Sequence, residues 1–314
     1  MSRPEPRAEP AAPAGPVRAA GGRGRAEPGP LARRPGPLWS LGLFRSELSV
    51  TFRRLRTLVL LAVLAGIPPL IGIAVRAETG DGGTAGGGGG EGPAFIGQIT
   101  HNGLFLVFAA LAATLPFFLP MTVGVVAGDS IAGEAGAGTL RYLLVAPAGR
   151  SRLLLAKFTA VLAFCLAATL TVALSALATG ALLFPLGEVT LLSGTAVPLH
   201  EGLSRALAIA VAVAASLAGL AALGLFVSTL TDSGVAAMAA TVGLLIAVQI
   251  VGAIPQLDAV HPYLFTHHWM SFADLLRDPV HWDGLLGNLA LQGVYAAVFG
   301  SAAWARFTGR DMTV

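Results

Sequence analysis

Charged residues are scarce in this chain of 314 residues. Asp, Glu, Lys and Arg together make up 12% of the sequence, whereas hydrophobic residues make up 54%. Soluble globular domains carry about 25% charged residues, because polar groups must cover their surfaces. The shortage excludes a pair of ordinary soluble domains. It predicts an all-α protein that crosses a membrane several times.

Cysteine and nucleotide-binding motifs are also lacking. Cys165 is the only cysteine, so the chain cannot form an internal disulfide or a cysteine-based metal site. The pattern G-x-x-x-x-G-K-[ST] does not occur, so ATP cannot bind this chain through a P-loop. We expect no enzyme activity, no cofactor of its own and no nucleic-acid partner for this chain.

Six long runs contain no Asp, Glu, Lys or Arg. About 20 apolar helical residues cross a bilayer core, and a charge at its centre costs about 2.5–3.5 kcal/mol. The expected spans are residues 57–75, 104–127, 158–184, 206–228, 234–254 and 285–305. In the second span, Pro116 and Pro120 predict a kink or a local break.

The basic residues are distributed unevenly between the two sides that these spans define. If the N-terminus is cytoplasmic, 17 of the 20 Lys and Arg residues face the cytoplasm, and only Arg76, Arg205 and Arg277 face outward. An excess of Lys and Arg marks the cytoplasmic side of a membrane protein. Both termini are therefore predicted to be cytoplasmic.

Two different segments precede the first span. Residues 1–37 contain nine prolines and seven arginines, and they predict a disordered cytoplasmic tail because they cannot bury enough apolar area to fold. Residues 38–56 instead form an amphipathic pattern, which predicts an interfacial helix on the inner leaflet. Its apolar positions recur at steps of three and four: Leu41, Phe44, Leu48, Phe52 and Leu55.

The polar side chains within the spans are hydroxyls and amides. The absence of an ionisable residue near the middle of any span weakens an ion-coupled carrier as a function. The hydroxyls and amides could line a pathway, but hydrogen bonding between helices is the simpler interpretation. They are Thr169, Thr171, Ser175, Ser216, Gln249 and Gln292.

Histidines gather on the predicted outer side, four of them in the loop 256–283 together with four aspartates. Imidazoles and carboxylates can ligate a transition metal, so a membrane-bound enzyme or an autonomous carrier using this loop is the alternative function. The spacing matches no compact ligand motif, and aromatic residues lie between the histidines. An interfacial aromatic belt is therefore favoured.

The predicted cytoplasmic loop 128–157 carries the clearest functional signal. It opens with Asp129 and Glu134, and acidic residues suit the first turn of a helix. Leu140, Leu143 and Leu144 then recur as one apolar face. A short amphipathic helix beneath the membrane would be a docking element for a cytosolic partner.

This loop resembles the coupling region of ABC type 2 permeases, especially the sodium-efflux and bacitracin-resistance-like branch of bacterial exporters. The shared pattern is an acid-rich start, then Glu-x-x-x-Gly-Thr-Leu, a proline and a basic return to the membrane. Here these positions are Glu134, Gly138, Thr139, Leu140, Pro147, Arg150 and Lys157. The segments 262–269 and 305–311 are also similar to that branch, and the resemblance covers residues 38–314.

The resemblance implies a six-helix permease subunit of an ABC exporter in the bacterial plasma membrane. Two copies, or one copy and a related permease, would form the substrate pathway. Two separate ATP-binding subunits would hold ATP and magnesium and drive transport. The residues that the resemblance and the loop pattern assign to ATPase coupling are Asp129, Glu134, Gly138, Thr139, Leu140, Arg141, Leu143 and Leu144.

Overall fold

The structure, a computed structural model, describes residues 37–80, 99–138 and 149–309. All of these residues belong to one unit, Pro35–Val314. The tail expected at residues 1–37 lies outside the described part, apart from Pro37, at which the first helix begins.

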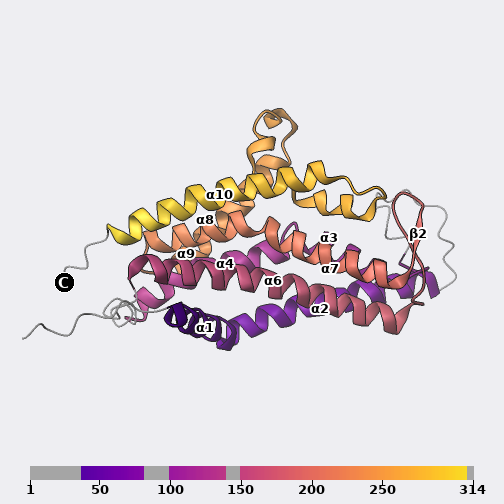
Figure 1. The fold of residues 1–314 in the computed structure, drawn as a ribbon, viewed down its shortest axis with the longest axis horizontal. Helices are drawn as coiled ribbons and strands as arrows, with labels where there is room; N and C mark the ends of the chain where they lie inside the picture. Colours follow the sequence, from indigo (N-terminus) through magenta and orange to yellow (C-terminus); the bar gives the residue numbers. More distant parts are fainter. Residues whose placement is uncertain (1–36, 81–98, 139–148, 310–314) are drawn as a thin grey trace, which may run out of the picture. The chain divides into compact units, whose positions relative to one another are not determined.

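The described residues are almost entirely helical (Figure 1). The α-helices are α1 (Pro37–Arg53), α2 (Leu55–Gly80), α3 (Phe105–Thr114), α4 (Phe118–Gly136), α6 (Arg150–Leu183), α7 (Leu199–Ser216), α8 (Ala218–Leu230), α9 (Gly234–Gly252) and α10 (Trp282–Thr308). A small antiparallel hairpin joins α6 to α7, and short 3-10 helices join α9 to α10. These are β1 (Val189–Thr190), β2 (Ala196–Val197), η2 (Pro255–Leu257), η3 (His261–Tyr263) and η4 (Trp269–Leu276).

Within residues 37–80, 99–138 and 149–309, five helical segments are long and apolar enough to cross a membrane, and the bent pair α3–α4 makes a sixth if it counts as one span. The five are α2, α6, α7 with α8, α9 and α10. Only 17% of the most apolar stretch of α2, α9 and α10 is buried, so these helices leave long apolar faces exposed. The high helix content and these five or six apolar segments confirm the all-α class.

The helices extend beyond the charge-free runs from which the spans were predicted. Helix α6 begins at Arg150 rather than at residue 158, and α4 continues to Gly136, past the expected limit at residue 127. The expected loop 128–157 therefore begins inside a helix. Charged residues can occupy helix ends when they find partners, so a charge-free run marks only the most apolar part of a helix.

The break predicted in the second span is confirmed. Helix α3 ends at Thr114, α4 begins at Phe118, and their axes differ by 54°. A proline cannot donate a backbone hydrogen bond, and its ring disturbs the preceding turn. The Pro116 carbonyl accepts a hydrogen bond from the Gln249 side chain on α9.

The fourth expected span, residues 206–228, lies within one apolar segment, Leu199–Leu230. It is interrupted at Leu217, between α7 and α8. Four buried side chains close the gap, and we call them the amide network: Ser216, Trp269, Asn288 and Gln292. No proline marks this break. Three of the four residues that stabilise it, Trp269, Asn288 and Gln292, lie far from it in the sequence.

Three hydrogen bonds of the amide network run between its side chains and buried backbone groups. Trp269 Nε1 donates to the Ser216 carbonyl at 2.9 Å, and the Gly219 amide donates to Gln292 Oε1 at 3.1 Å. Gln292 Nε2 also donates to the Phe265 carbonyl at 2.8 Å. Backbone groups without a helical partner are costly in an apolar interior, so these bonds make the break tolerable.

The helices run side by side, and α1 lies across them, seen foreshortened in Figure 1. The hairpin lies at one end of the bundle, the hairpin end, and Lys157 lies near the opposite end, the Lys157 end. The main core fills the bundle between them, and a smaller cluster around Ile131, Leu153 and Phe307 packs at the Lys157 end. Gly103 and Gly180 let backbones touch near the hairpin end, since a Cβ on Gly103 would lie 2.4 Å from the Gly180 carbonyl.

Candidate functional site at the Lys157 end

The predicted coupling residues fall into two groups. Asp129 and Glu134 lie in the last turns of α4, and Gly138 follows its end. Gly138 has a φ of +71°, a left-handed conformation that commonly ends helices at glycine. The other predicted coupling residues, Thr139, Leu140, Arg141, Leu143 and Leu144, lie outside the described residues.

The expectation that Asp129 and Glu134 occupy the first turn of a helix was wrong. A carboxylate near the C-terminal end of a helix is disfavoured by the helix dipole. Both side chains are nevertheless buried, because cationic side chains of other helices compensate them. Together these charged residues form what we call the Lys157 cluster: Glu47, Arg54, Arg56, Asp129, Glu134 and Lys157.

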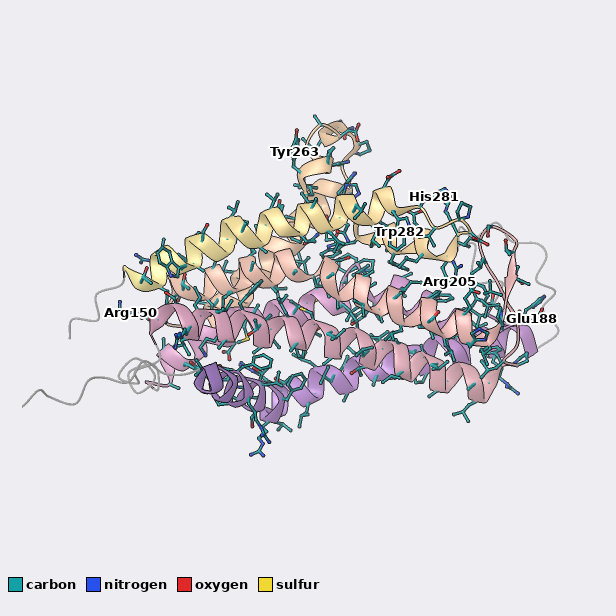
Figure 2. The ribbon with its side chains drawn as sticks, in the orientation of Figure 1. Arg150, Glu188, Arg205, Tyr263, His281 and Trp282 are labelled. Atoms are coloured by element: carbon teal, nitrogen blue, oxygen red, sulfur yellow. The ribbon has the colours of Figure 1, made fainter. Side chains whose placement is uncertain are left out.

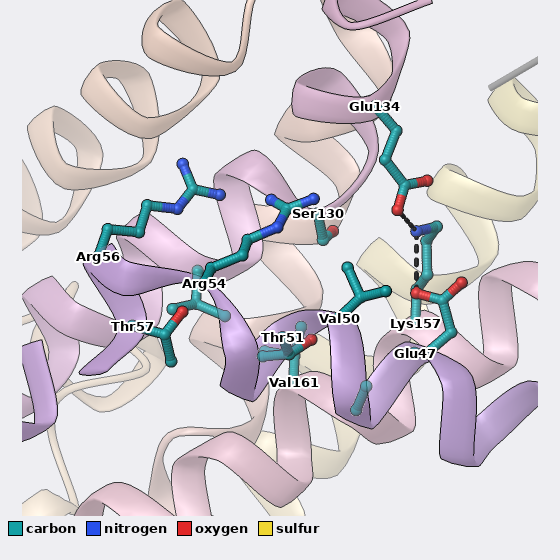
Figure 3. Close-up of a pocket in the computed structure, with 12 residues that line it drawn as sticks. Glu47, Val50, Thr51, Arg54, Arg56, Thr57, Ser130, Glu134, Lys157 and Val161 are labelled. Atoms are coloured by element: carbon teal, nitrogen blue, oxygen red, sulfur yellow. Dashed lines mark hydrogen bonds and ion pairs between the residues drawn. The ribbon is translucent and has the colours of Figure 1, made fainter. Parts of the chain in front are cut away.

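Lys157 is the centre of the first half of this cluster. Its Nζ lies 2.7 Å from Glu134 Oε1 and 3.1 Å from Glu47 Oε2 (Figure 3). The Lys157 side chain is only 2% exposed. A buried ammonium is tolerated only when it is paired and hydrogen-bonded. Lys157 therefore ties the beginning of α6 to both α1 and the end of α4.

Asp129 is the centre of the second half. Its carboxylate pairs with the guanidinium groups of Arg54, between α1 and α2, and Arg56, at the start of α2. The Asp129 side chain is 6% exposed, whereas both arginines are partly exposed. The first half joins two carboxylates to one cation, and the second joins one carboxylate to two cations. Their formal charges cancel.

Two glycines make room for the Asp129 carboxylate. A Cβ on either Gly133 or Gly234 would lie 2.4 Å from Asp129 Oδ1. Gly234 begins α9, and the positive end of a helix dipole favours a nearby carboxylate. Asp129 thus connects α4 to α2 through ion pairs and to α9 through close packing.

The two halves of the cluster share one small cavity of about 20 Å³, enough for a single water molecule. Figure 3 shows Arg54, Ser130, Glu134 and Lys157 around it. The end of α4 is also fixed from the other side, where Ser228 Oγ on α8 accepts hydrogen bonds from the Ile131 and Ala132 amides. Ion pairs and hydrogen bonds therefore hold α2, α6 and α8 to the last turns of α4.

Four members of the cluster are not among the predicted coupling residues: Glu47, Arg54, Arg56 and Lys157. The sequence pattern assigns Lys157 only to the basic return to the membrane. Glu47 is the single acidic residue between positions 38 and 56. A lone acid among apolar and basic residues is the signal that could have indicated an ion pair.

The histidines predicted on the outer side form no metal centre among the residues that the structure describes, where no group of three or more His, Cys, Asp or Glu could hold an ion. The rings of His267 and His268 are 4.6 Å apart. Burial, and then the neighbouring His267, lower the pKa of His268 below its usual value. Figure 2 shows Tyr263 on the projecting segment between α9 and α10, apart from Arg205 and His281.

The polar residues that could have lined a pathway bond mainly within the described bundle. Ser216 and Gln292 belong to the amide network, and Ser175 donates to the Ala65 carbonyl at 2.6 Å. The hydroxyls of Thr169 and Thr171 donate to carbonyls of their own helix. Hydrogen bonding between helices is therefore confirmed for Ser175, Ser216 and Gln292, whereas Thr169 and Thr171 bond only within α6.

A family model described as "Protein of unknown function (DUF2705)" matches residues 94–313. The chain belongs to this family. The DUF2705 match includes Asp129, Glu134 and Lys157 and leaves out Glu47, Arg54 and Arg56. The description itself names no activity.

Two curated relatives are similar to a shorter segment. Both are named "Probable ABC transporter permease protein NosY", one from Stutzerimonas stutzeri and one from Pseudomonas aeruginosa. Each is 39% identical over 67 residues, which is 21% of this DUF2705 chain. The chain matches about a quarter of their length, 24%. Together with the apolar helices, these similarities point to a multi-pass membrane protein related to permeases.

Proposed function

We propose that the chain is the permease subunit of an ABC exporter in a bacterial plasma membrane. Two ATP-binding subunits dock at the Lys157 end, which faces the cytoplasm together with both termini. A second copy of the chain, or a related permease, completes the substrate pathway. The chain itself hydrolyses no ATP.

The similarity to the two permeases supports this class, and so do the missing P-loop and the concentration of basic residues on one side. The Lys157 cluster is the structural observation that carries the proposal. It joins the turns that lead into residues 139–148 to the beginnings of α2 and α6. A force that an ATP-binding subunit applies to that segment would be transmitted to α4, and from α4 to α2 and α6 through ion pairs.

Co-purification with the ATP-binding subunit tests the proposal. Because Glu134 is buried against Lys157, Leu140 is the better position for a disruptive change. Burial of a leucine contributes about 1.5–3 kcal/mol, so Leu140→Asp should weaken ATPase binding roughly ten- to a hundredfold. Asp278→Lys, in the segment between α9 and α10, is the matched control and should leave binding unchanged. Equal recovery of a P-loop ATPase with wild type and Leu140→Asp would contradict this docking site.

The orientation can be measured separately. Reporters fused after Val314 should be active in the cytoplasm, and a reporter inserted at Gly86 should be active outside. An external reading at Val314 would remove the proposed topology, whatever the ATPase result.

A further inference from the structure

The outward face of α1 differs from the face that it turns to the bundle. Gly42, Arg45, Ser46, Val50 and Arg53 are all exposed. Positions three, four, seven and eight apart lie on one side of a helix, so these residues form one stripe. We call it the α1 stripe, and it contains two arginines and no acidic residue.

The single acidic residue of α1 lies on the opposite side. Glu47 is 7% exposed, and Lys157 neutralises it inside the bundle. The nearby cations Arg54 and Arg56 are engaged by Asp129. Among the described residues, Arg45 and Arg53 have no ion-pair partner. Lys157, Arg54 and Arg56 thus pair with buried carboxylates. Arg45 and Arg53 lie instead on the exposed side of α1.

The apolar residues around the α1 stripe continue onto α2. Val50 is 44% exposed and Leu55 is 76% exposed. Leu58, Val59 and Val63 extend the same kind of surface along a helix that is long and apolar enough to cross a membrane. A basic stripe that runs into the exposed face of a membrane helix fits the boundary between lipid phosphates and acyl chains.

We propose that Arg45 and Arg53 bind the phosphate groups of anionic phospholipids and so hold α1 in the plane of the membrane. The two arginines are eight residues apart, about 12 Å along the helix, so they contact two different headgroups. Because α1 lies across the bundle and is ion-paired to α6, lipid bound on one side supports the Lys157 cluster on the other. This inference rests on the proposed function only in placing the Lys157 end at the cytoplasmic leaflet.

An acidic surface of an ATP-binding subunit would be a different occupant of the α1 stripe. The continuity with the exposed leucines and valines of α2 favours lipid, since a soluble subunit does not reach the acyl region. A basic residue near a membrane surface contributes about 1 kcal/mol to binding anionic lipid, which is about a fivefold change in affinity. Loss of both arginines should therefore weaken binding roughly 30-fold.

The experiment titrates the purified full chain in neutral detergent with phosphatidylglycerol and follows its thermal unfolding midpoint. Parallel titrations use phosphatidylcholine and soluble glycerol phosphate, to separate a lipid headgroup from free phosphate. The Arg45→Gln/Arg53→Gln variant should lose about 30-fold in apparent affinity for phosphatidylglycerol. The Arg45→Lys/Arg53→Lys variant, which keeps both charges, should stay within a fewfold of wild type.

The matched control is Arg152→Gln/Arg306→Gln, which removes the same charge from exposed positions on α6 and α10. It should keep most of the affinity. Equal losses in the two glutamine variants would overturn the proposal in favour of a general charge effect. An unchanged lipid titration with lost ATPase recovery would identify the α1 stripe as a protein-docking surface instead. Lipid binding is measured without any ATPase, so failed ATPase co-purification would leave this result standing.

Discussion

The bundle contains two buried polar networks, and they differ in the kind of group that they bury. The Lys157 cluster consists of charged side chains from α1, α2, α4 and α6, close to where these helices begin or end. The amide network consists of uncharged side chains and lies at an interruption within one apolar segment. The Lys157 cluster joins separate helices to one another, whereas the amide network stabilises the interruption between α7 and α8.

The difference follows from the cost of burying charge. An ion pair inside an apolar interior must recover a desolvation penalty of several kcal/mol per ion, and it does so best near the membrane surface. A broken helix exposes backbone amides and carbonyls, which carry no net charge. Neutral donors and acceptors can satisfy them at any depth. Charge is therefore expected where helices meet at the surface, and amides where a helix is interrupted.

The largest effect should come from Lys157→Met. This change leaves Glu47 and Glu134 buried without their cation, and breaking a buried pair costs about 3–5 kcal/mol. We expect most of the protein to be lost from the membrane fraction, and a large drop in resistance to unfolding by SDS in mixed micelles.

A triple variant separates charge from shape at this position. Adding Glu47→Gln and Glu134→Gln to Lys157→Met removes the uncompensated carboxylates and should recover much of the lost stability. If Lys157→Met alone were as stable as wild type, the cluster would contribute nothing to the fold, and the contrast with the amide network would fail.

A smaller effect is expected from Gln292→Leu in the amide network. The leucine cannot accept from the Gly219 amide or donate to the Phe265 carbonyl, and a buried group left unsatisfied costs about 1–3 kcal/mol. SDS unfolding in mixed micelles should show the loss. Gln292→Glu keeps the acceptor but adds a buried charge, so it should be less stable than Gln292→Leu. The reverse order would show that charge is tolerated at this depth.

A single hydrogen bond within the same network should matter less. Trp269→Phe keeps an aromatic ring against Phe265 but removes the N–H group that reaches the Ser216 carbonyl. Hydrogen bonds between membrane helices average about 0.6 kcal/mol, so we expect a loss of that order, plus a small packing cost. Trp304→Phe removes a comparable bond, to Ser151, at an exposed position and should cost less still. Equal costs for the two variants would mean that burial adds nothing to this bond.

The two helix breaks were not equally predictable from the sequence. Charge-free runs predicted the positions of the apolar helices, and Pro116 predicted the α3–α4 break because a proline acts locally. The α7–α8 break could not be predicted, since Trp269, Asn288 and Gln292 lie at least 50 residues away from it.

The acids of the Lys157 cluster illustrate the same limit in another way. Asp129 and Glu134 directly follow Gly128 and Gly133, and such glycines suggest a loop. Their partners Arg54, Arg56 and Lys157 are distant in sequence, and these cations compensate the two acids inside a helix that continues to Gly136. Whether residues 139–144 couple to an ATPase stays a prediction.

The smallest expected effect concerns pH, and it tests whether the uncharged character of the amide network extends to His268, the residue before Trp269. His268 packs beside Gly287 on α10, and both its burial and the neighbouring His267 lower its pKa in the folded protein. In the unfolded chain a histidine has a pKa of about 6.5. The unfolded state therefore binds more protons than the folded state just below that pH, and stability rises with pH through this window.

His268→Gln should flatten the pH dependence of SDS unfolding below pH 6.5 and leave stability above pH 7 nearly unchanged. His267→Gln removes only the repulsive neighbour, so it should flatten the same slope in part. A steeper slope in His268→Gln than in wild type would mean that another group, not this imidazole, is forced to stay neutral as the protein folds.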